Sequence, residues 1–217
     1  TENAQPALMA TSMAALAAMK AEGIGLERAS FVAGHSLGEY SALCAAGAVS
    51  LADTARLLRI RGRAMQAAVP VGQGAMAAVL GLDAEAAAKV AQDAAQGDVC
   101  QLANENDPTQ NVLSGSKAAI ERAVVLAKEA GAKRALPLPV SAPFHCALMQ
   151  PAADEMAKAL EGVQFDNPAV PLVANVLADA ESDATRIKAL LVEQVTGRVR
   201  WRSSVEWMAA QGVNEFW

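Results

Sequence analysis

The stretch SFVAGHSLGEYSALCAAGAV, residues 30–49, decides the fold. A short apolar run of strand character, SFVA, precedes the pattern G-x-S-x-G over residues 34–38, and an alanine-rich segment of helical character follows it. Strand, sharp turn and helix in that order form a nucleophile elbow, in which small flanking residues tighten the turn and expose the serine hydroxyl at the helix N-terminus. We therefore expect Ser36 to act as a nucleophile.

The same residues allow a second interpretation. Ser36 and Glu39 match the S-x-x-E pattern of a capping box, in which the serine caps the helix and the glutamate returns a hydrogen bond. A capping box has no use for glycine at both Gly34 and Gly38. The strand-turn-helix setting therefore favours the elbow.

The composition is that of a globular protein: of 217 residues, 53% are hydrophobic and 19% are charged. No apolar run approaches the roughly 18 residues of a membrane helix, and the first residues lack the form of a secretory signal. With 18 basic and 23 acidic residues, the chain has no general footprint for nucleic acid. Three scattered cysteines predict neither a disulfide framework nor a zinc site, which favours a cytoplasmic location.

The order of the elements predicts an α/β protein with an inserted small domain. A helix over 6–22, a strand over 31–33, the elbow and a long helix over 51–69, capped by Ser50, come first. Residues 75–140 then follow the order βαββαβ, which is that of a ferredoxin-like unit. Helices near 148–161 and 183–196 and a strand over 170–176 come next. We expect a discontinuous larger domain, 1–71 and 141–217, interrupted by a ferredoxin-like domain, 72–140.

A serine hydroxyl needs a base to remove its proton, and the chain has two histidines. His35 is adjacent to Ser36, and neighbouring side chains diverge in a tight turn, so His35 is expected to be a packed or hydrogen-bonding support. His145, in SAPFHCALM, is then the remaining candidate. Asp98 and Asp107 precede it in the chain order of an α/β-hydrolase triad, but both lie in the inserted domain. A dyad oriented by a backbone or amide oxygen is the simpler prediction, and Gln194 is a candidate for that support.

The helix over 51–69 carries one arginine on its apolar face. At about 100° per residue, Arg61 lies about 60° from Leu58, beside Met65, whereas three other arginines fall on the outer face: Arg56, Arg59 and Arg63. A buried guanidinium needs a polar or anionic partner. The partner is either an internal carboxylate or one that arrives with the substrate and is held bidentately. With a serine nucleophile and one histidine, the second alternative suggests acyl transfer from a substrate that has a free carboxylate.

Several segments, in matching order along the chain, resemble the malonyl-CoA:acyl carrier protein transacylases of fatty-acid synthesis: GHSLGEYSALCAAGAVS, RGRAMQ, GAMAAVLGL, SAPFHCALM and QVTGRVRWRSSVEWMAAQGV. The resemblance implies an α/β-hydrolase-like larger subdomain with a ferredoxin-like insertion. It also implies transfer of malonyl from malonyl-CoA to the phosphopantetheine thiol of acyl carrier protein through a malonyl-serine intermediate. No metal or cofactor is expected.

The resemblance also implies roles for individual residues. Ser36 is expected to accept the acyl group, His145 to act as base and then acid, and Arg61 to hold the malonyl carboxylate. The backbone N–H of Leu37 is expected to be an oxyanion donor at a helix N-terminus. Further residues are expected to bind or line the substrate site: Gln194, Asn104, Asn106, Met65 and Phe144.

Some expectations concern the surface and the ends of the chain. Lys133 and Arg134 are expected to meet the acidic carrier protein, with a merely solvated pair as the alternative. The family begins with a strand and a glutamine-bearing loop that supplies a second oxyanion contact, and it continues beyond the segment EFW. Neither part is in this sequence, so the resemblance implies a fragment with impaired activity.

Three other functions stay open at this stage. The chain is alternatively an acyltransferase domain of a polyketide or fatty-acid megasynthase, a generic serine thioesterase or esterase, or a non-catalytic carrier-binding module. The first shares all the chemistry above. The second needs no buried guanidinium, and in the third Ser36 is a helix cap.

Overall fold

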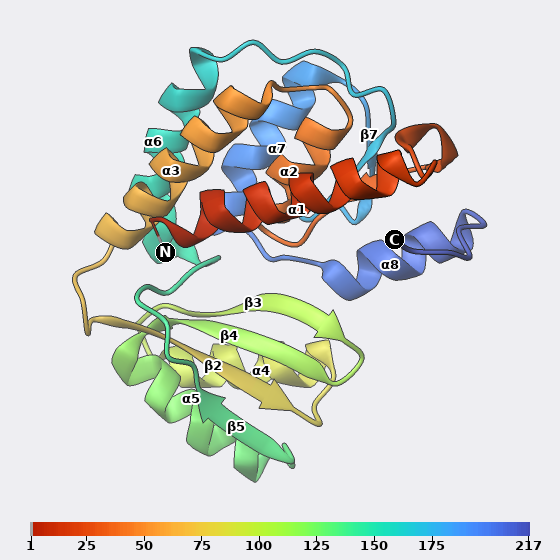
Figure 1. Cartoon of the computed structure of the whole chain (residues 1–217). Coiled ribbons are helices and arrows are strands. Elements are labelled where there is room, and N and C mark those ends of the chain that lie inside the picture. Colours follow the sequence, from red (N-terminus) through yellow and green to blue (C-terminus); the bar gives the residue numbers. More distant parts are fainter. Residues whose placement is uncertain (1) are drawn as a thin grey trace.

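The computed structural model describes residues 2–217, which form two β-sheets and the helices around them. The three-stranded sheet has the order β1–β6–β7, and the four-stranded sheet has the order β3–β4–β2–β5. In Figure 1 the four-stranded sheet and its two helices lie below a separate group of helices. Two chain connections on one side of the picture join these two parts.

The elbow belongs to the upper part. Strand β1 (Val32–Ala33) pairs in parallel with β6 (Leu172–Ala174), and β6 pairs antiparallel with β7 (Asp179–Glu181). The helices of this part are α1 (Ala4–Ala21), α2 (Gly38–Ala45), α3 (Leu51–Ala67), α6 (Gln150–Glu161), α7 (Ala184–Thr196) and α8 (Trp201–Ala210). Strand β7 is not predicted from the sequence, because its three residues, Asp-Ala-Glu, are polar and lack a β pattern.

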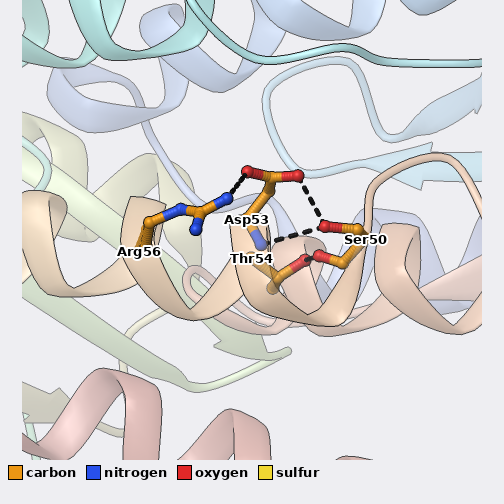
Figure 2. Close-up of polar contacts among 4 residues, drawn as sticks. All are labelled: Ser50, Asp53, Thr54 and Arg56. Atoms are coloured by element: carbon orange, nitrogen blue, oxygen red, sulfur yellow. Dashed lines mark hydrogen bonds and ion pairs between the residues drawn. The ribbon is translucent and has the colours of Figure 1, made fainter.

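The start of α3 is fixed by the predicted cap at Ser50. Figure 2 shows Ser50 Oγ accepting a hydrogen bond from the Asp53 N–H at 3.0 Å. The Asp53 carboxylate accepts from Ser50 Oγ at 2.5 Å and also pairs with Arg56, and Thr54 Oγ1 donates to the Ser50 carbonyl at 2.8 Å. The cap satisfies a backbone N–H of the first turn, which would otherwise lack a partner, and so stabilises the start of α3 at this residue.

The helical wheel of α3 is correct apart from its first residue. Leu58 and Met65 are each at most 1% exposed, as the wheel predicts, and Leu57, which lies about 100° from Leu58, is buried as well. At about 100° per residue Leu51 falls within about 60° of Leu58, which predicts an inward position, but it is 56% exposed. It stands at the very start of α3, and the fully buried residues of this helix begin only at Thr54.

The larger core lies among the helices of the upper part. Its buried residues come from α2, α3, α6, α7 and β6, among them Leu43, Leu58, Met156, Leu191 and Leu172. Burial of such side chains stabilises the fold by about 1.5–3 kcal/mol each. Since these four helices and strand β6 contribute to it, this core fixes the positions of the helices that present the polar residues described below.

The lower part has the ferredoxin-like arrangement that the sequence predicts. Strands β2 (Gly74–Leu80), β3 (Cys100–Asp107), β4 (Gln110–Ser116) and β5 (Arg134–Pro137) form the sheet, with α4 (Ala84–Ala95) and α5 (Lys117–Glu129) between them in sequence. Every neighbouring pair in this sheet is antiparallel. The helices pack closely because their buried faces are largely alanine: Ala87, Ala91, Ala94, Ala119, Ala123 and Ala127. The domain boundaries at 71/72 and 140/141 stay a prediction.

Strand β3 also joins the two parts of the molecule. The Glu105 N–H donates to the Val199 carbonyl at 2.9 Å, and the Val199 N–H donates to the Ala103 carbonyl at 2.8 Å. Arg198 forms an ion pair with Glu105 at 2.7 Å. These contacts hold the end of β3 against the segment between α7 and α8. No helix among residues 2–217 combines the length and apolar character that would let it cross a membrane.

Candidate active site

The turn at Ser36 has the strained geometry of an elbow. Ser36 has φ +55°, in the left-handed region that a serine seldom adopts. A β-carbon at Gly34 would lie 2.0 Å from the carbonyl carbon of Gly38, so only glycine fits there, whereas one at Gly38 would meet none of the described atoms within 4 Å. The sequence argument from both glycines therefore holds for Gly34, and no steric reason appears at Gly38.

The serine hydroxyl does not act as a helix cap. Ser36 Oγ lies 2.7 Å from His145 Nε2 and 3.0 Å from Arg61 Nη2. The Glu39 carboxylate contacts the Asn175 N–H and the Gln194 side chain instead of returning to Ser36. The capping-box interpretation is therefore wrong, and the hydroxyl lies where a nucleophile would contact its base.

The hydrogen bonds of His145 fix its tautomer. Its Nδ1 lies 2.9 Å from the backbone carbonyl of Gln194, which only accepts, so Nδ1 carries the proton. Nε2 is then free to accept the Ser36 hydroxyl proton. The orienting group is a backbone oxygen where many serine enzymes have a carboxylate, which is the dyad that the sequence predicts.

Burial also keeps His145 neutral. The side chain is 4% exposed, and this burial, together with the Arg61 charge, lowers the pKa of His145 to about 3. The hydrogen bond to the Gln194 carbonyl acts in the opposite direction. A neutral imidazole at ordinary pH is the form that a general base requires.

Arg61 lies inside the protein, as the helical wheel predicts. It is 1% exposed, and its guanidinium donates to Gln5 Oε1 at 2.8 Å, Gln194 Oε1 at 2.8 Å and Ser36 Oγ at 3.0 Å. No carboxylate of residues 2–217 comes within 4.0 Å of it, and its Nε–H lacks an acceptor among them. The partners of the guanidinium are neutral, so a free carboxylate would be its first direct anionic partner.

Gln194 connects these groups. Its side-chain oxygen accepts from Arg61, its side-chain nitrogen donates to the Ser36 carbonyl at 2.8 Å, and its backbone carbonyl holds His145. It is fully buried on α7. The structure thus brings together Ser36, His145, Arg61 and Gln194, which lie far apart in the sequence.

The other predicted site residues take different positions. The Leu37 N–H, next to Ser36, has no acceptor within residues 2–217 and is a free donor. Met65 is buried, with its sulfur 3.8 Å from Gln5 Nε2. Phe144 is half-buried and packs against cores of both parts of the molecule.

Asn106 and Asn104 differ in their relation to the elbow. Asn106 Oδ1 lies 2.9 Å from His35 Nε2, and the His35 ring packs against Trp201. Asn104 is buried in β3 opposite Val199 and shares no hydrogen bond with the groups around Ser36 among the described residues. His35 thus supports the junction of the two parts.

The two predicted basic residues lie on the surface of the ferredoxin-like part. Lys133 and Arg134 are exposed at the start of β5, which is an edge strand. No hydrogen bond or ion pair of residues 2–217 ties either side chain down. A contact with a carrier protein stays a prediction.

Sequence reasoning missed Gln5 and Asn175. Gln5 is 4% exposed in the first turn of α1 and contacts Arg61, whereas Asn175 is fully buried directly after β6. Asn175 Oδ1 accepts from the Ser36 N–H at 2.7 Å. Since β1 and β6 are parallel, Ser36 and Asn175 follow the carboxyl ends of neighbouring strands, where α/β proteins place their sites. A polar residue after the apolar run VPLVA was the available indication.

Comparison with known proteins identifies the family. Residues 1–214 match the model of the acyl transferase domain. The chain belongs to the acyl transferase family. A curated relative, malonyl CoA-acyl carrier protein transacylase of Escherichia coli K12, is 49% identical over 217 residues, which cover 100% of this chain and 70% of the relative.

Solved structures of this family have the same fold. An acyl-carrier-protein S-malonyltransferase from Bartonella henselae is 59% identical, with a TM-score of 0.95 over 99% of this acyl transferase and 68% of that chain. A malonyl-transacylase in complex with the acyl-carrier protein of a type II polyketide synthase is 47% identical, with a TM-score of 0.94 over 98% of this chain and 68% of that one.

The two glycines of the elbow predict opposite outcomes on substitution. In this acyl transferase, Gly34→Ala is expected to lower the free energy of unfolding by about 3 kcal/mol, because the added methyl group overlaps the Gly38 backbone. Gly38→Ala is expected to keep or raise stability, because alanine favours the helix and its methyl group would meet none of the described atoms within 4 Å. Urea denaturation of both variants tests the pair, and equal losses would contradict the steric account.

The low pKa of His145 predicts an unusual pH profile. Acylation of Ser36 should stay level from about pH 7 to about pH 5, where a histidine of ordinary pKa would lose roughly 30-fold. Quench-flow measurement of acylation, with circular dichroism to confirm folding at each pH, tests this. A fall with a midpoint near 6.5, the ordinary value, would contradict it.

The low pKa of His145 also affects stability. The histidine of the unfolded chain binds a proton at higher pH than the buried one does, so the free energy of unfolding should decrease as the pH falls from about 6.5 toward 3.

Proposed function

We propose that the protein transfers a malonyl group from malonyl-CoA to the phosphopantetheine thiol of acyl carrier protein, in fatty acid biosynthesis, through a malonyl ester on Ser36. The family and the names of its relatives support malonyl transfer to acyl carrier protein. The observation that carries the proposal in this chain is the buried Arg61 guanidinium, 3.0 Å from the Ser36 hydroxyl and without a carboxylate partner among residues 2–217.

The first half-reaction forms the acyl-enzyme. Ser36 Oγ attacks the thioester carbonyl of malonyl-CoA while His145 Nε2 takes the hydroxyl proton, because the two atoms already lie 2.7 Å apart. The Leu37 N–H is a free donor for the oxyanion. The C–S bond then breaks, and the departing CoA thiolate takes the proton from His145.

The second half-reaction reverses these roles. The phosphopantetheine thiol gives its proton to His145 Nε2 and attacks the ester carbonyl. The C–O bond breaks, and Ser36 Oγ recovers the proton from His145. After both half-reactions Ser36 and His145 have returned to their starting protonation states, and the malonyl group has moved from CoA to the carrier protein. The proposed transfer therefore uses one nucleophile and one base and no cofactor.

Arg61 supplies the specificity in this proposal. Its guanidinium pairs with the malonyl carboxylate, and such a charge-assisted contact is strong in a buried site. The neutral side-chain amides of Gln5 and Gln194 accept hydrogen bonds from the guanidinium and hold it in place. Met65 and Phe144 are proposed to line the same site, with Asn104 and Asn106 at its margin.

The carrier protein is proposed to dock on the side of Lys133 and Arg134. A relative 47% identical to this chain has been solved in complex with an acyl-carrier protein, which supports a carrier as partner. Carrier proteins are acidic, and exposed basic residues steer such partners. The three cysteines are free, which supports a reducing, cytoplasmic location.

Intact-mass spectrometry after mixing with malonyl-CoA tests the proposal. The expected result is a malonyl adduct on the peptide that contains Ser36, followed by its transfer to holo-acyl carrier protein. Release of free malonate in place of transfer would indicate a thioesterase. Absence of any adduct on a folded sample would contradict the proposal.

A further inference from the structure

Glu39 is a buried carboxylate for which the mechanism above has no use. It stands in the first turn of α2, is 1% exposed, and has no cationic nitrogen of residues 2–217 within 4.0 Å. Such a group is costly to bury unless hydrogen bonds compensate it. A neutral or apolar side chain at this position would cost less free energy to bury. The contacts of Glu39 therefore point to a functional role.

Both of its oxygens accept hydrogen bonds from residues that hold the site. Oε1 accepts from the backbone N–H of Asn175, and Oε2 accepts from Gln194 Nε2 at 2.5 Å. Asn175 follows β6, and Gln194 lies on α7. One carboxylate thus links the elbow helix, the end of a central strand and the helix that supports His145.

The contact with Gln194 determines which way its amide faces. Arg61 only donates and the Ser36 carbonyl only accepts, so the amide oxygen must face Arg61 and the amide nitrogen must face Ser36 and Glu39. Turning the amide over would place its oxygen against the carboxylate and its nitrogen against the guanidinium. Glu39 therefore opposes a rotation of the Gln194 amide that would take away one of the acceptors of Arg61.

The contact with Asn175 steadies the elbow itself. The Asn175 side chain accepts from the Ser36 N–H at 2.7 Å and donates to the Gly34 carbonyl at 2.8 Å. These two bonds span the turn in which Ser36 has φ +55°. A residue that holds the Asn175 backbone consequently limits the movement of the strained serine.

We propose that Glu39 is a positioning residue, whose buried carboxylate orients the Gln194 amide and the Asn175 backbone and, through them, Ser36 and Arg61. Burial opposes the charge of this group and raises the pKa of Glu39 to about 8, while the hydrogen bonds from Asn175 and Gln194 and the Arg61 charge act in the opposite direction. Both oxygens nevertheless face donors, which is the arrangement of an acceptor-only carboxylate, and the proposal rests on this geometry.

The substitution Glu39→Gln tests the proposal with little change of shape. A glutamine at this position has one oxygen that accepts and one NH2 group that donates, whereas Asn175 and Gln194 both donate. Its NH2 group would therefore face an N–H group of one of them, and that hydrogen bond would be lost. We expect the rate of Ser36 labelling by a fluorophosphonate probe, and the rate of acylation by malonyl-CoA, to fall roughly 10- to 100-fold. Ser41→Ala is the control, because Ser41 is buried on the same helix with a hydroxyl that has no partner within residues 2–217.

A double-mutant cycle separates positioning from a general loss of stability. In the Gln194→Ala background, which keeps the backbone carbonyl for His145, Glu39→Gln should cost less than about fivefold. An equal factor in both backgrounds, or an unchanged labelling rate in the single variant, would overturn the proposal. If the glutamine variant does not fold by circular dichroism, Glu39→Asp replaces it with the same expectation, because aspartate is too short to reach both donors.

The inference rests on the proposed function only for the malonyl-CoA measurement. The fluorophosphonate probe reports on Ser36 and its base with no malonyl group present. A parent protein that labels but is not acylated by malonyl-CoA contradicts the proposed substrate and leaves the role of Glu39 testable. A parent protein that does both, with a variant that equals it, contradicts the role of Glu39 alone.

Discussion

Replacing His145 with alanine is expected to slow the acylation of Ser36 by malonyl-CoA by roughly 10²- to 10⁴-fold, the usual contribution of a general base. The neutral imidazole lies 2.7 Å from the hydroxyl and is the base that the structure offers to it. Stopped-flow or quench-flow measurement of a single turnover reports the acylation step directly. The variant should bind malonyl-CoA almost as before, because His145 is not proposed to hold the carboxylate.

The second histidine provides the matched control. His35 is adjacent to Ser36 in sequence but contacts Asn106 and Trp201. His35→Ala removes one hydrogen bond, worth about 1 kcal/mol. If all of this energy is lost from the transition state, the acylation rate falls roughly fivefold, which is the expected result. If His35→Ala were the more damaging of the two, the assignment of His145 as the base would be wrong.

Removal of Arg61 is expected to change the choice of substrate. Arg61→Ala should raise the activation free energy of acylation by malonyl-CoA by about 2–4 kcal/mol, because a buried charge pair is lost. The acylation rate should therefore fall roughly 30- to 1000-fold. Acylation by acetyl-CoA, which has no carboxylate, should change little. Arg61→Lys should fall between the two, since an ammonium keeps the charge without the planar fork.

Two control measurements distinguish loss of carboxylate recognition from loss of the folded structure. The acetyl-CoA rate of the same variant reports whether the nucleophile and base still work. Arg59→Ala, on the same helix with a side chain 60% exposed, should behave as the parent protein with both donors. An equal loss of both rates in Arg61→Ala would indicate a structural role and contradict carboxylate recognition.

Local patterns predict the elements that surround the site. The elbow follows from Gly34 and the apolar run before it, the cap of α3 from Ser50, and the inward direction of Arg61 from the phase of that helix. Each of these depends on residues a few positions apart, so the sequence contains the needed information. The resemblance to a known family implies the role of each of these groups.

The network behind the site was not predictable in the same way. Gln5, Asn175 and Glu39 act through partners more than 50 positions away, as in the contacts Gln5 to Arg61, Asn175 to Ser36 and Glu39 to Gln194. Their local patterns suggest an ordinary helix start, a strand end and a helix cap. Only the packing of α1, α2, α7 and the β6 end around one point gives these residues their partners.

The structure of the trapped malonyl-enzyme tests the central claim most directly. The predicted result is an ester on Ser36 Oγ whose free carboxylate lies about 2.7–3.0 Å from the guanidinium nitrogens of Arg61, with the guanidinium still held by Gln5 and Gln194. A malonyl carboxylate that points to solvent, or an Arg61 that leaves its buried position, would contradict the account.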